Sequence, residues 1–236
     1  MGSIYLIRHG QASFGADDYD VLSPMGIRQA QVLGTHLVDL GLTFDRCLSG
    51  KLLRQQDTAR HALAQYAEAG HDIPVVETDS AFDEFDAEGV IRALIPAMLA
   101  EEPEALSILR NAAEDSAGFQ RLFTLITRRW LSGQYDSPEL QSWTAFLARV
   151  QAGLHRILET AGNHERIAVF TSGGTITALL HLITGMPVQQ AFELHCHIVN
   201  TSLHQLKFKG NQVSLASFNS YTHLQLLKTP ELITYR

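Results

Sequence analysis

An arginine, a histidine and a glycine end the first apolar run of the chain, at Arg8, His9 and Gly10. A neutral imidazole can attack phosphorus, and the planar guanidinium beside it can hold two phosphate oxygens at once. The glycine would let the backbone approach a ligand closely. A histidine at a strand end can also be hydrogen-bonded for purely structural reasons, so the tripeptide alone leaves both interpretations open.

A second arginine, Arg54, lies in the first turn of a predicted helix. The helix macrodipole favours acids in a first turn, so some other interaction should hold a cation there. A phosphate shared with Arg8 would be such an interaction, and a solvated surface position is the alternative.

Acidic residues follow the third predicted strand, in the segment 82–86. Cleavage of a phosphoester needs a proton donor for the leaving oxygen, and a carboxyl group can supply it. Asp83, Glu84, Asp86 and Glu88 are the candidates, and any of them could serve only to solvate the loop.

The elements that must position these residues alternate between strands and helices. Strands are predicted at 4–8, 46–48, 75–76, 167–170, 198–207 and 212–218. Helices are predicted from Pro24 to Gly41, from Lys51 to Ala69 and from Gly174 to about Thr184. This order favours an α/β fold with a mostly parallel sheet flanked by helices, and such sheets bind ligands at their carboxyl edge. Apolar residues at helical spacing between about 88 and 161 predict an α-helical insertion within a single domain, 1–236.

These motifs resemble those of the histidine phosphatase superfamily, also called phosphoglycerate-mutase-like. Arg8-His9-Gly10 is similar to the family signature, and the run from Leu52 to Ala59 is similar to its second phosphate-binding element. The resemblance implies a three-layer α/β fold and a phosphohistidine formed on His9. It also implies phosphate binding by Arg8 and Arg54 and general acid catalysis by Glu84.

One position departs from the family pattern. The family usually carries a second histidine before a Gly-Gly turn, and here Ser172 precedes Gly173 and Gly174. Amides at that helix amino terminus, Gly173 included, can still hold an anion, and the serine hydroxyl can add one hydrogen bond. What is lost is an imidazole that can carry positive charge against a transferring phosphoryl group.

Three interpretations of the substitution stay open. The site could work with two arginines and one histidine, or another histidine such as His223 could fill part of the gap. The chain could also bind phosphate with little or no turnover. His223 could instead be structural, and Gln11 and Ser13, in the loop after the first strand, are accessory candidates.

His195 and His197 alternate along a predicted extended segment, where they would point the same way and could bind zinc with a third group. No convincing partner cluster accompanies them, so we predict packing or hydrogen-bonding roles, no metal site and no cofactor.

Composition limits the classes of partner. The net charge of -7 disfavours nucleic acid and anionic membranes, so a phosphate site must be a local positive pocket. The amino terminus has no basic region before its apolar run, and no apolar stretch approaches membrane-spanning length. Cys47 and Cys196 are far apart in sequence, so a disulfide framework is not expected and a cytoplasmic location is the default.

The sequence therefore predicts a metal-independent phosphatase that hydrolyses a phosphomonoester through His9. The alternatives are a phosphoglycerate-type mutase and a phosphate-binding or scaffold protein. The expected ligand is a phosphorylated small molecule or inorganic phosphate. We expect the loop at 14–19 and the insertion to select the substrate, and the sequence predicts neither the substrate nor an oligomeric state.

Overall fold

The computed structural model describes residues 1–13, 20–101 and 116–235. The predicted substrate loop at 14–19 and part of the predicted insertion lie outside these ranges. The described chain forms two compact units, one of residues 1–84 and 150–236 and one of residues 85–149. The reading of the chain as a single domain with an insertion at 88–161 stays a prediction.

Within the described residues, the first unit contains a six-stranded mixed sheet in the order β3-β2-β4-β1-β5-β6. Its strands are β1 (Gly2–Arg8), β2 (Arg46–Ser49), β3 (Val76–Thr78), β4 (Arg166–Thr171), β5 (Leu203–Lys209) and β6 (Gln212–Ser220). The first four run parallel, and β5 and β6 are antiparallel additions joined by a turn at Gly210, which has a positive φ of 55°. The predicted α/β sheet is confirmed, except that β5 begins at Leu203 rather than at Ile198.

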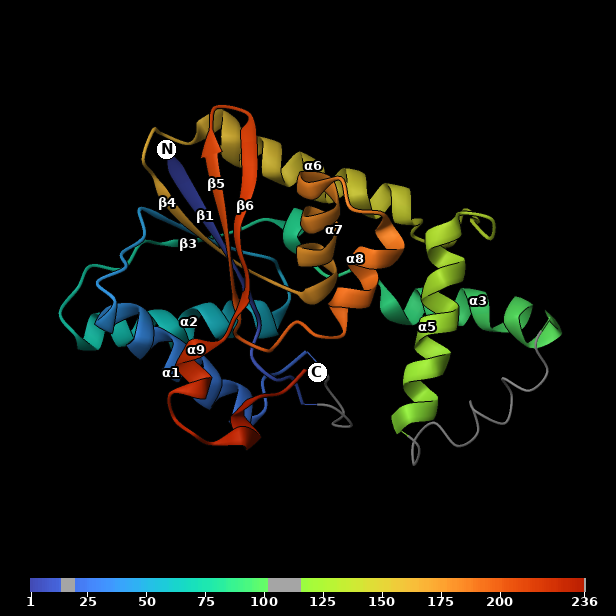
Figure 1. Ribbon diagram of the computed structural model, residues 1–236, viewed down its shortest axis with the longest axis horizontal. Helices are drawn as coiled ribbons and strands as arrows, with labels where there is room; N and C mark the ends of the chain where they lie inside the picture. Colours follow the sequence, from blue (N-terminus) through green and yellow to red (C-terminus); the bar gives the residue numbers. More distant parts are fainter. Residues whose placement is uncertain (14–19, 102–115, 236) are drawn as a thin grey trace. The chain divides into compact units, whose positions relative to one another are not determined.

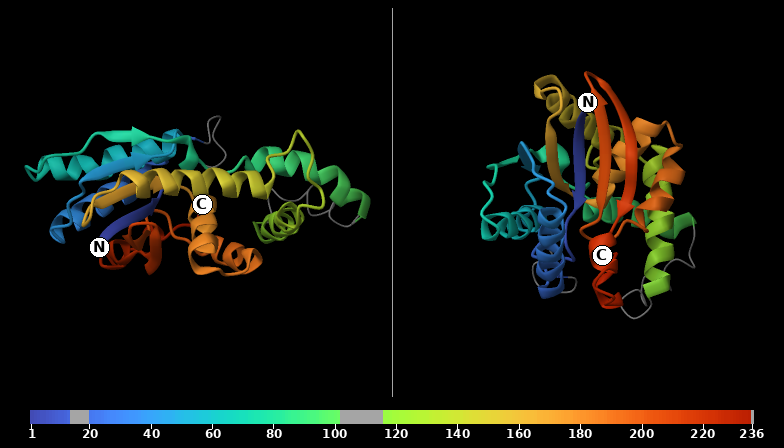
Figure 2. Two further views of the ribbon diagram at one scale, coloured as in Figure 1. Left: turned by 90° about the horizontal axis from the view of Figure 1, so that it is seen from above. Right: turned by 60° about the vertical axis from the view of Figure 1, so that its left-hand side comes forward.

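Helices cover both faces of this sheet. They are α1 (Pro24–Asp39), α2 (Leu53–Glu68), α7 (Gly173–Thr184), α8 (Val188–His195), α9 (Thr222–Gln225) and the short 3-10 helices η1 (Ser80–Phe82) and η2 (Pro230–Leu232). Figure 2 shows α1 and α2 on one face and α7 on the other. The Ser23 hydroxyl accepts a hydrogen bond from the Gly26 amide at 3.0 Å, so the predicted start of α1 is confirmed.

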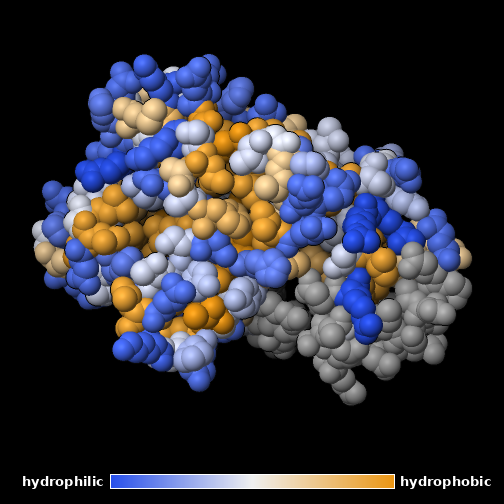
Figure 3. Space-filling model, viewed as in Figure 1, coloured by the Kyte–Doolittle hydropathy of each residue, from blue (hydrophilic) through white to orange (hydrophobic). Residues whose placement is uncertain are grey.

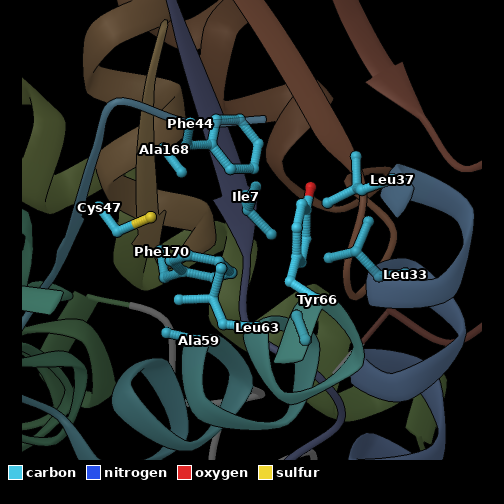
Figure 4. Close-up of a cluster of buried hydrophobic side chains, with 11 residues drawn as sticks. Ile7, Leu33, Leu37, Phe44, Cys47, Ala59, Leu63, Tyr66, Ala168 and Phe170 are labelled. Atoms are coloured by element: carbon cyan, nitrogen blue, oxygen red, sulfur yellow. The ribbon is translucent and has the colours of Figure 1, made fainter. Parts of the chain in front are cut away.

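The core beneath α1 and α2 is built from alternate strand residues, whose side chains point to the same face of the sheet, and from the inner faces of the two helices. Figure 4 shows Ile7 of β1 and Phe170 of β4 directed toward Leu33 of α1 and Leu63 of α2. Such alternation fixes the strand register, because a slip by one residue would turn the apolar set to the other face. Register matters here because β1 carries the arginine and histidine at its end.

The opposite face of the sheet packs against α7. Leu6 of β1 and Leu206 of β5 line one small hollow with Ile176 and Leu179 of α7. Apolar side chains gather over α7 and β6, and again around α9, on the face drawn in Figure 3. The sheet is therefore covered on both sides, as the three-layer prediction requires.

The second unit is helical in its described part. It contains α3 (Ala87–Glu101), α5 (Ser116–Ser132) and the start of α6 (Trp143–Thr160), which ends in the first unit. Trp130 is buried and stacks on Phe85 at 4.6 Å between ring centroids, so it belongs to the core of this unit. Over the described ranges, no helix is both long and apolar enough to cross a lipid bilayer.

Candidate active site

The predicted site residues meet at one edge of the sheet because parallel strands end there together. Arg8 at the end of β1 pairs with Thr171 at the end of β4, and Ser49 of β2 pairs with Phe170. The segments that follow these three strands carry His9, Ser172 and the start of α2. This is the carboxyl edge at which open α/β sheets bind ligands.

His9 is buried, with 3% of its surface exposed, and its orientation is fixed by its neighbours. Its Nδ1 lies 2.7 Å from the Gly10 carbonyl oxygen. A carbonyl can only accept, so Nδ1 carries the proton and Nε2 keeps its lone pair. Burial lowers the pKa of His9 well below 6.5, and Arg54 and Arg8 lower it further. The ring is therefore neutral at pH 7, as an attacking imidazole must be.

The backbone around His9 is held from behind by residues 200 and 201. The Asn200 side chain donates to the His9 carbonyl at 3.0 Å, and the Thr201 amide lies 3.1 Å from the Arg8 carbonyl and 3.3 Å from that of His9. Thr201 has a positive φ of 60°, a conformation that needs support in a β-branched residue. These bonds fix where the imidazole points.

Arg54 is buried at the amino terminus of α2, and its Nη1 lies 2.7 Å from Asp20 Oδ1. The other Asp20 oxygen accepts the Leu53 amide at 2.7 Å, so one carboxylate both caps α2 and pairs with the arginine. We predicted that a phosphate explains a cation in this turn, and the structure adds Asp20 as its protein partner. Sequence reasoning missed Asp20, which is 34 residues away from Arg54.

Arg8 is also buried, and its guanidinium donates to two carbonyls of the carboxyl-terminal part of the chain. Nη1 donates to the Ile198 carbonyl, and Nη2 donates to that of Tyr235 at 3.0 Å. Both of these acceptors are backbone carbonyls, which carry partial negative charge but no formal charge. The effect of Arg8 and Arg54 on the His9 pKa places both cations near the imidazole.

Glu84 lies at the amino terminus of α7, where its Oε2 accepts the Gly174 amide at 3.1 Å. The carboxylates of two neighbouring acids accept other backbone amides. Asp83 Oδ1 accepts the Lys51 amide at 2.5 Å, and Asp86 Oδ1 accepts the Gly89 amide at 2.8 Å near the start of α3. Of these acids, Glu84 is the one bonded to the turn that contains Gly173 and Gly174.

Ser172 is fully buried, and its hydroxyl accepts a hydrogen bond from Gln55 Nε2 at 2.8 Å. The same Gln55 nitrogen donates to the Phe82 carbonyl at 3.0 Å. Gln55 thus ties α2 to both the turn before α7 and the segment before Glu84. Sequence reasoning missed this role, although Gln55 lies next to Arg54.

His195 does not lie on an extended segment. It is the last residue of α8, with Cys196 as the helix cap, so the prediction that His195 and His197 alternate on a strand is wrong. The apolar residues of α8 pack by helical period, with Ala191 and Phe192 buried. The His195 ring instead lies against Gly173, at the turn that carries Ser172.

Packing gives one reason for a glycine at position 10, and the predicted close approach of its backbone to a ligand stays a prediction. A Cβ at Gly10 would lie 2.5 Å from the Gly26 carbonyl oxygen, so its small size permits close contact with α1. Of the accessory candidates, Gln11 accepts the Ser23 hydroxyl at 2.8 Å, and the Ser13 amide donates to the Val21 carbonyl at 2.8 Å. Both bonds shape the loop after β1.

His223 is buried, and its Nε2 lies 3.0 Å from the Thr201 hydroxyl. Its ring also lies 5.9 Å from that of His36, measured between centroids. These contacts support the segment behind His9, and a direct role for His223 in the site stays a prediction.

Comparison with known families agrees with this geometry. The model of the histidine phosphatase superfamily (branch 1) matches residues 4–119 and 113–221. The chain belongs to this superfamily. The two matches include the ends of β1, β2 and β4, at which the predicted site residues meet.

Among curated proteins, the chain is 31% identical over 143 residues to the mitochondrial serine/threonine-protein phosphatase Pgam5 of Drosophila simulans. The match covers 60% of this chain and 44% of that relative, so the chain spans less than half of its length.

Solved structures share the fold at low identity. A putative α-ribazole-5'-P phosphatase from Escherichia coli K-12 matches with a TM-score of 0.63 and 21% identity, covering 93% of this chain and 96% of its own. A phosphoglycerate mutase from Bacillus anthracis matches with a TM-score of 0.63 and 18% identity, covering 97% of each chain. The equal scores mean that the fold alone does not separate a phosphatase from a mutase.

Proposed function

We propose that this protein is a metal-independent phosphatase that hydrolyses a phosphomonoester through a phosphohistidine on His9. The observation that carries the proposal is the state of His9. Its Nδ1 donates to the Gly10 carbonyl at 2.7 Å, and burial and two neighbouring arginines keep it neutral. Such a ring presents Nε2 as a nucleophile to an anion held by the arginines.

In the first step, His9 Nε2 attacks phosphorus in line with the ester oxygen, forming a P–N bond as the P–O bond breaks. Arg8 and Arg54 neutralise the non-bridging oxygens, since phosphoryl transfer depends mainly on positioning and charge stabilisation. Glu84 acts as the general acid: it passes a proton to the leaving alkoxide and ends the step as a carboxylate. The Gly10 carbonyl stabilises the positive ring of the intermediate through Nδ1.

In the second step, Glu84 takes a proton from a water molecule as the oxygen of that water attacks phosphorus. The P–N bond breaks, which releases inorganic phosphate and restores neutral His9. Glu84 then carries the proton that it needs for the next cycle. The position of Glu84 beside the Gly174 amide supports this assignment.

The proposal is tested by hydrolysis of p-nitrophenyl phosphate by the full chain. The wild type should release nitrophenol and inorganic phosphate in equal amounts, and His9→Ala should lose the activity, while the surface variant His197→Ala keeps it. Equal rates in the wild type and His9→Ala would contradict the proposed nucleophile. Absent turnover with retained phosphate binding would favour the phosphate-binding alternative, and isomerisation of phosphoglycerate without phosphate release would favour a mutase.

A further inference from the structure

The turn that lacks the expected histidine has another histidine packed on it. A Cβ built on Gly173 would lie 2.9 Å from Cε1 of His195, 3.3 Å from Nδ1 and 3.6 Å from Nε2. The ring edge that carries both nitrogens therefore faces the Gly173 backbone. A side chain at position 173 would push the ring away, so the glycine makes room for the imidazole.

The ring of His195 is held in this orientation by α7 and α8. Nδ1 lies 3.4 Å from the Thr177 hydroxyl, which itself donates to the Gly173 carbonyl at 2.8 Å. The Phe192 ring stacks on the imidazole, with 5.5 Å between centroids and 16° between planes. An imidazole restrained by a stacked ring and a hydroxyl is preorganised, which is what stabilisation of a transition state requires.

The charged groups that act on His195 are those of the proposed site. Burial lowers the pKa of His195, Glu84 acts to raise it when its carboxyl group is ionised, the Arg8 guanidinium acts to lower it, and a hydrogen bond to the Gly173 backbone acts to raise it. The imidazole therefore lies within electrostatic reach of the proposed general acid and of one phosphate-binding arginine. A bound phosphate dianion would favour the imidazolium form, which can donate a hydrogen bond.

We propose that the His195 imidazole, delivered by the end of α8, contacts the transferring phosphoryl group and supplies the positive donor that Ser172 cannot. This inference rests on the proposed function, because it needs phosphoryl transfer at His9. His195 lies 23 positions after Ser172 in the sequence. It would replace the missing histidine by packing against Gly173, not by occupying position 172 itself.

The test compares wild type, His195→Ala, His195→Gln and the control His197→Ala, whose side chain is exposed two residues away. With p-nitrophenyl phosphate, loss of one preorganised donor should lower kcat roughly 100-fold in His195→Ala. Inhibition by vanadate, which mimics the transition state, should weaken much more than inhibition by inorganic phosphate. A purely structural role would weaken both inhibitors alike, and His197→Ala should stay within about twofold of wild type.

Gly173→Ala provides a second variant that keeps the imidazole but displaces it, and it should lose vanadate affinity in the same direction. If His195→Ala fails to fold by circular dichroism, His195→Gln and Gly173→Ala carry the test. Wild-type kcat and vanadate affinity in folded His195 variants, with His9→Ala inactive, would overturn this inference and leave the proposed function standing. If His9→Ala were as active as the wild type, both would fall together.

Discussion

At the scale of single residues, the site depends on the protonation state of His9. A protonated ring cannot attack, and Arg54 contributes to keeping it unprotonated. The arginines therefore have two roles in this account. We propose that they bind the anion, and before it arrives they help to keep the imidazole of His9 neutral through electrostatic repulsion.

We predict that the Cε1 proton resonance of His9 titrates below pH 6.5 in the free protein and that Arg54→Gln raises its pKa. Removal of a nearby cation takes away one cause of the lowered pKa, so the shift must be upward. Arg60→Gln, on the exposed side of α2, is the control and should leave the His9 titration unchanged. A His9 pKa at or above 6.5 in the wild type would show that the ring is not held neutral.

Local motifs were sufficient to name Arg8, His9, Arg54 and Glu84 as candidates, and their roles in catalysis stay predictions. Asp20 and Gln55 could not be predicted in this way, because their roles depend on contacts made across the fold. Asp20 reaches α2 from the preceding loop, and Gln55 reaches Ser172 from α2. Neither contact has a local sequence signal.

At the scale of elements, α2 is positioned through its first turn. The Asp20 carboxylate accepts the Leu53 amide and pairs with Arg54, so it replaces the side-chain cap that Leu52 cannot provide. The Asp20 carboxylate therefore couples the start of α2 to the orientation of Arg54 and to its position relative to His9.

Asp20→Ala should lower the free energy of unfolding by about 1 kcal/mol, because a helix amide loses its partner. It should also lower kcat/KM roughly tenfold or more, because Arg54 loses its restraint. Asp57→Ala is the matched control, because Asp57 lies on α2 and pairs with the exposed Arg60. It should change the free energy of unfolding by less than about 0.5 kcal/mol. Chemical denaturation and steady-state kinetics would measure both effects, and equal behaviour of the two variants would contradict the assigned role of Asp20.

The strands and the helices α1 and α2 could be predicted because apolar periodicity and capping residues are local signals. The segment from 188 to 198 was predicted wrongly as extended at its end. Alternating histidines suggested period two, but tertiary packing of Ala191 and Phe192 selects the helix α8. This error hid the position of His195, which only the folded chain brings to Gly173.

At the scale of the whole molecule, several buried histidines make folding stability depend on pH. His204 and His223 are almost fully buried, and burial is the main cause that lowers the pKa of each to about 3. His204 Nδ1 also accepts the Asn219 amide at 3.1 Å, which requires this nitrogen to be unprotonated. Both rings are thus neutral in the folded protein at pH values where the unfolded chain would protonate them.

Because the folded pKa lies below the unfolded value of 6.5, stability is fully present above pH 6.5 and is lost as the pH falls toward 3. Each of these histidines should lower the free energy of unfolding by roughly 1 kcal/mol between pH 7.5 and pH 5.5. Urea denaturation at the two pH values would measure the fall. In His204→Gln the fall should be smaller by about that amount, and an unchanged slope would show that His204 is protonated in the folded state.

The central claim is that the phosphoryl group passes through His9 Nε2, and direct trapping of the intermediate tests it most directly. The protein is mixed with ³²P-labelled phosphomonoester, quenched within milliseconds in base and digested for mass spectrometry. We expect a base-stable, acid-labile label on the peptide that contains His9, absent in His9→Ala and increased in Glu84→Gln, in which the second step is slowed. Turnover by the wild type with no label on His9, or with label on another residue, would contradict it.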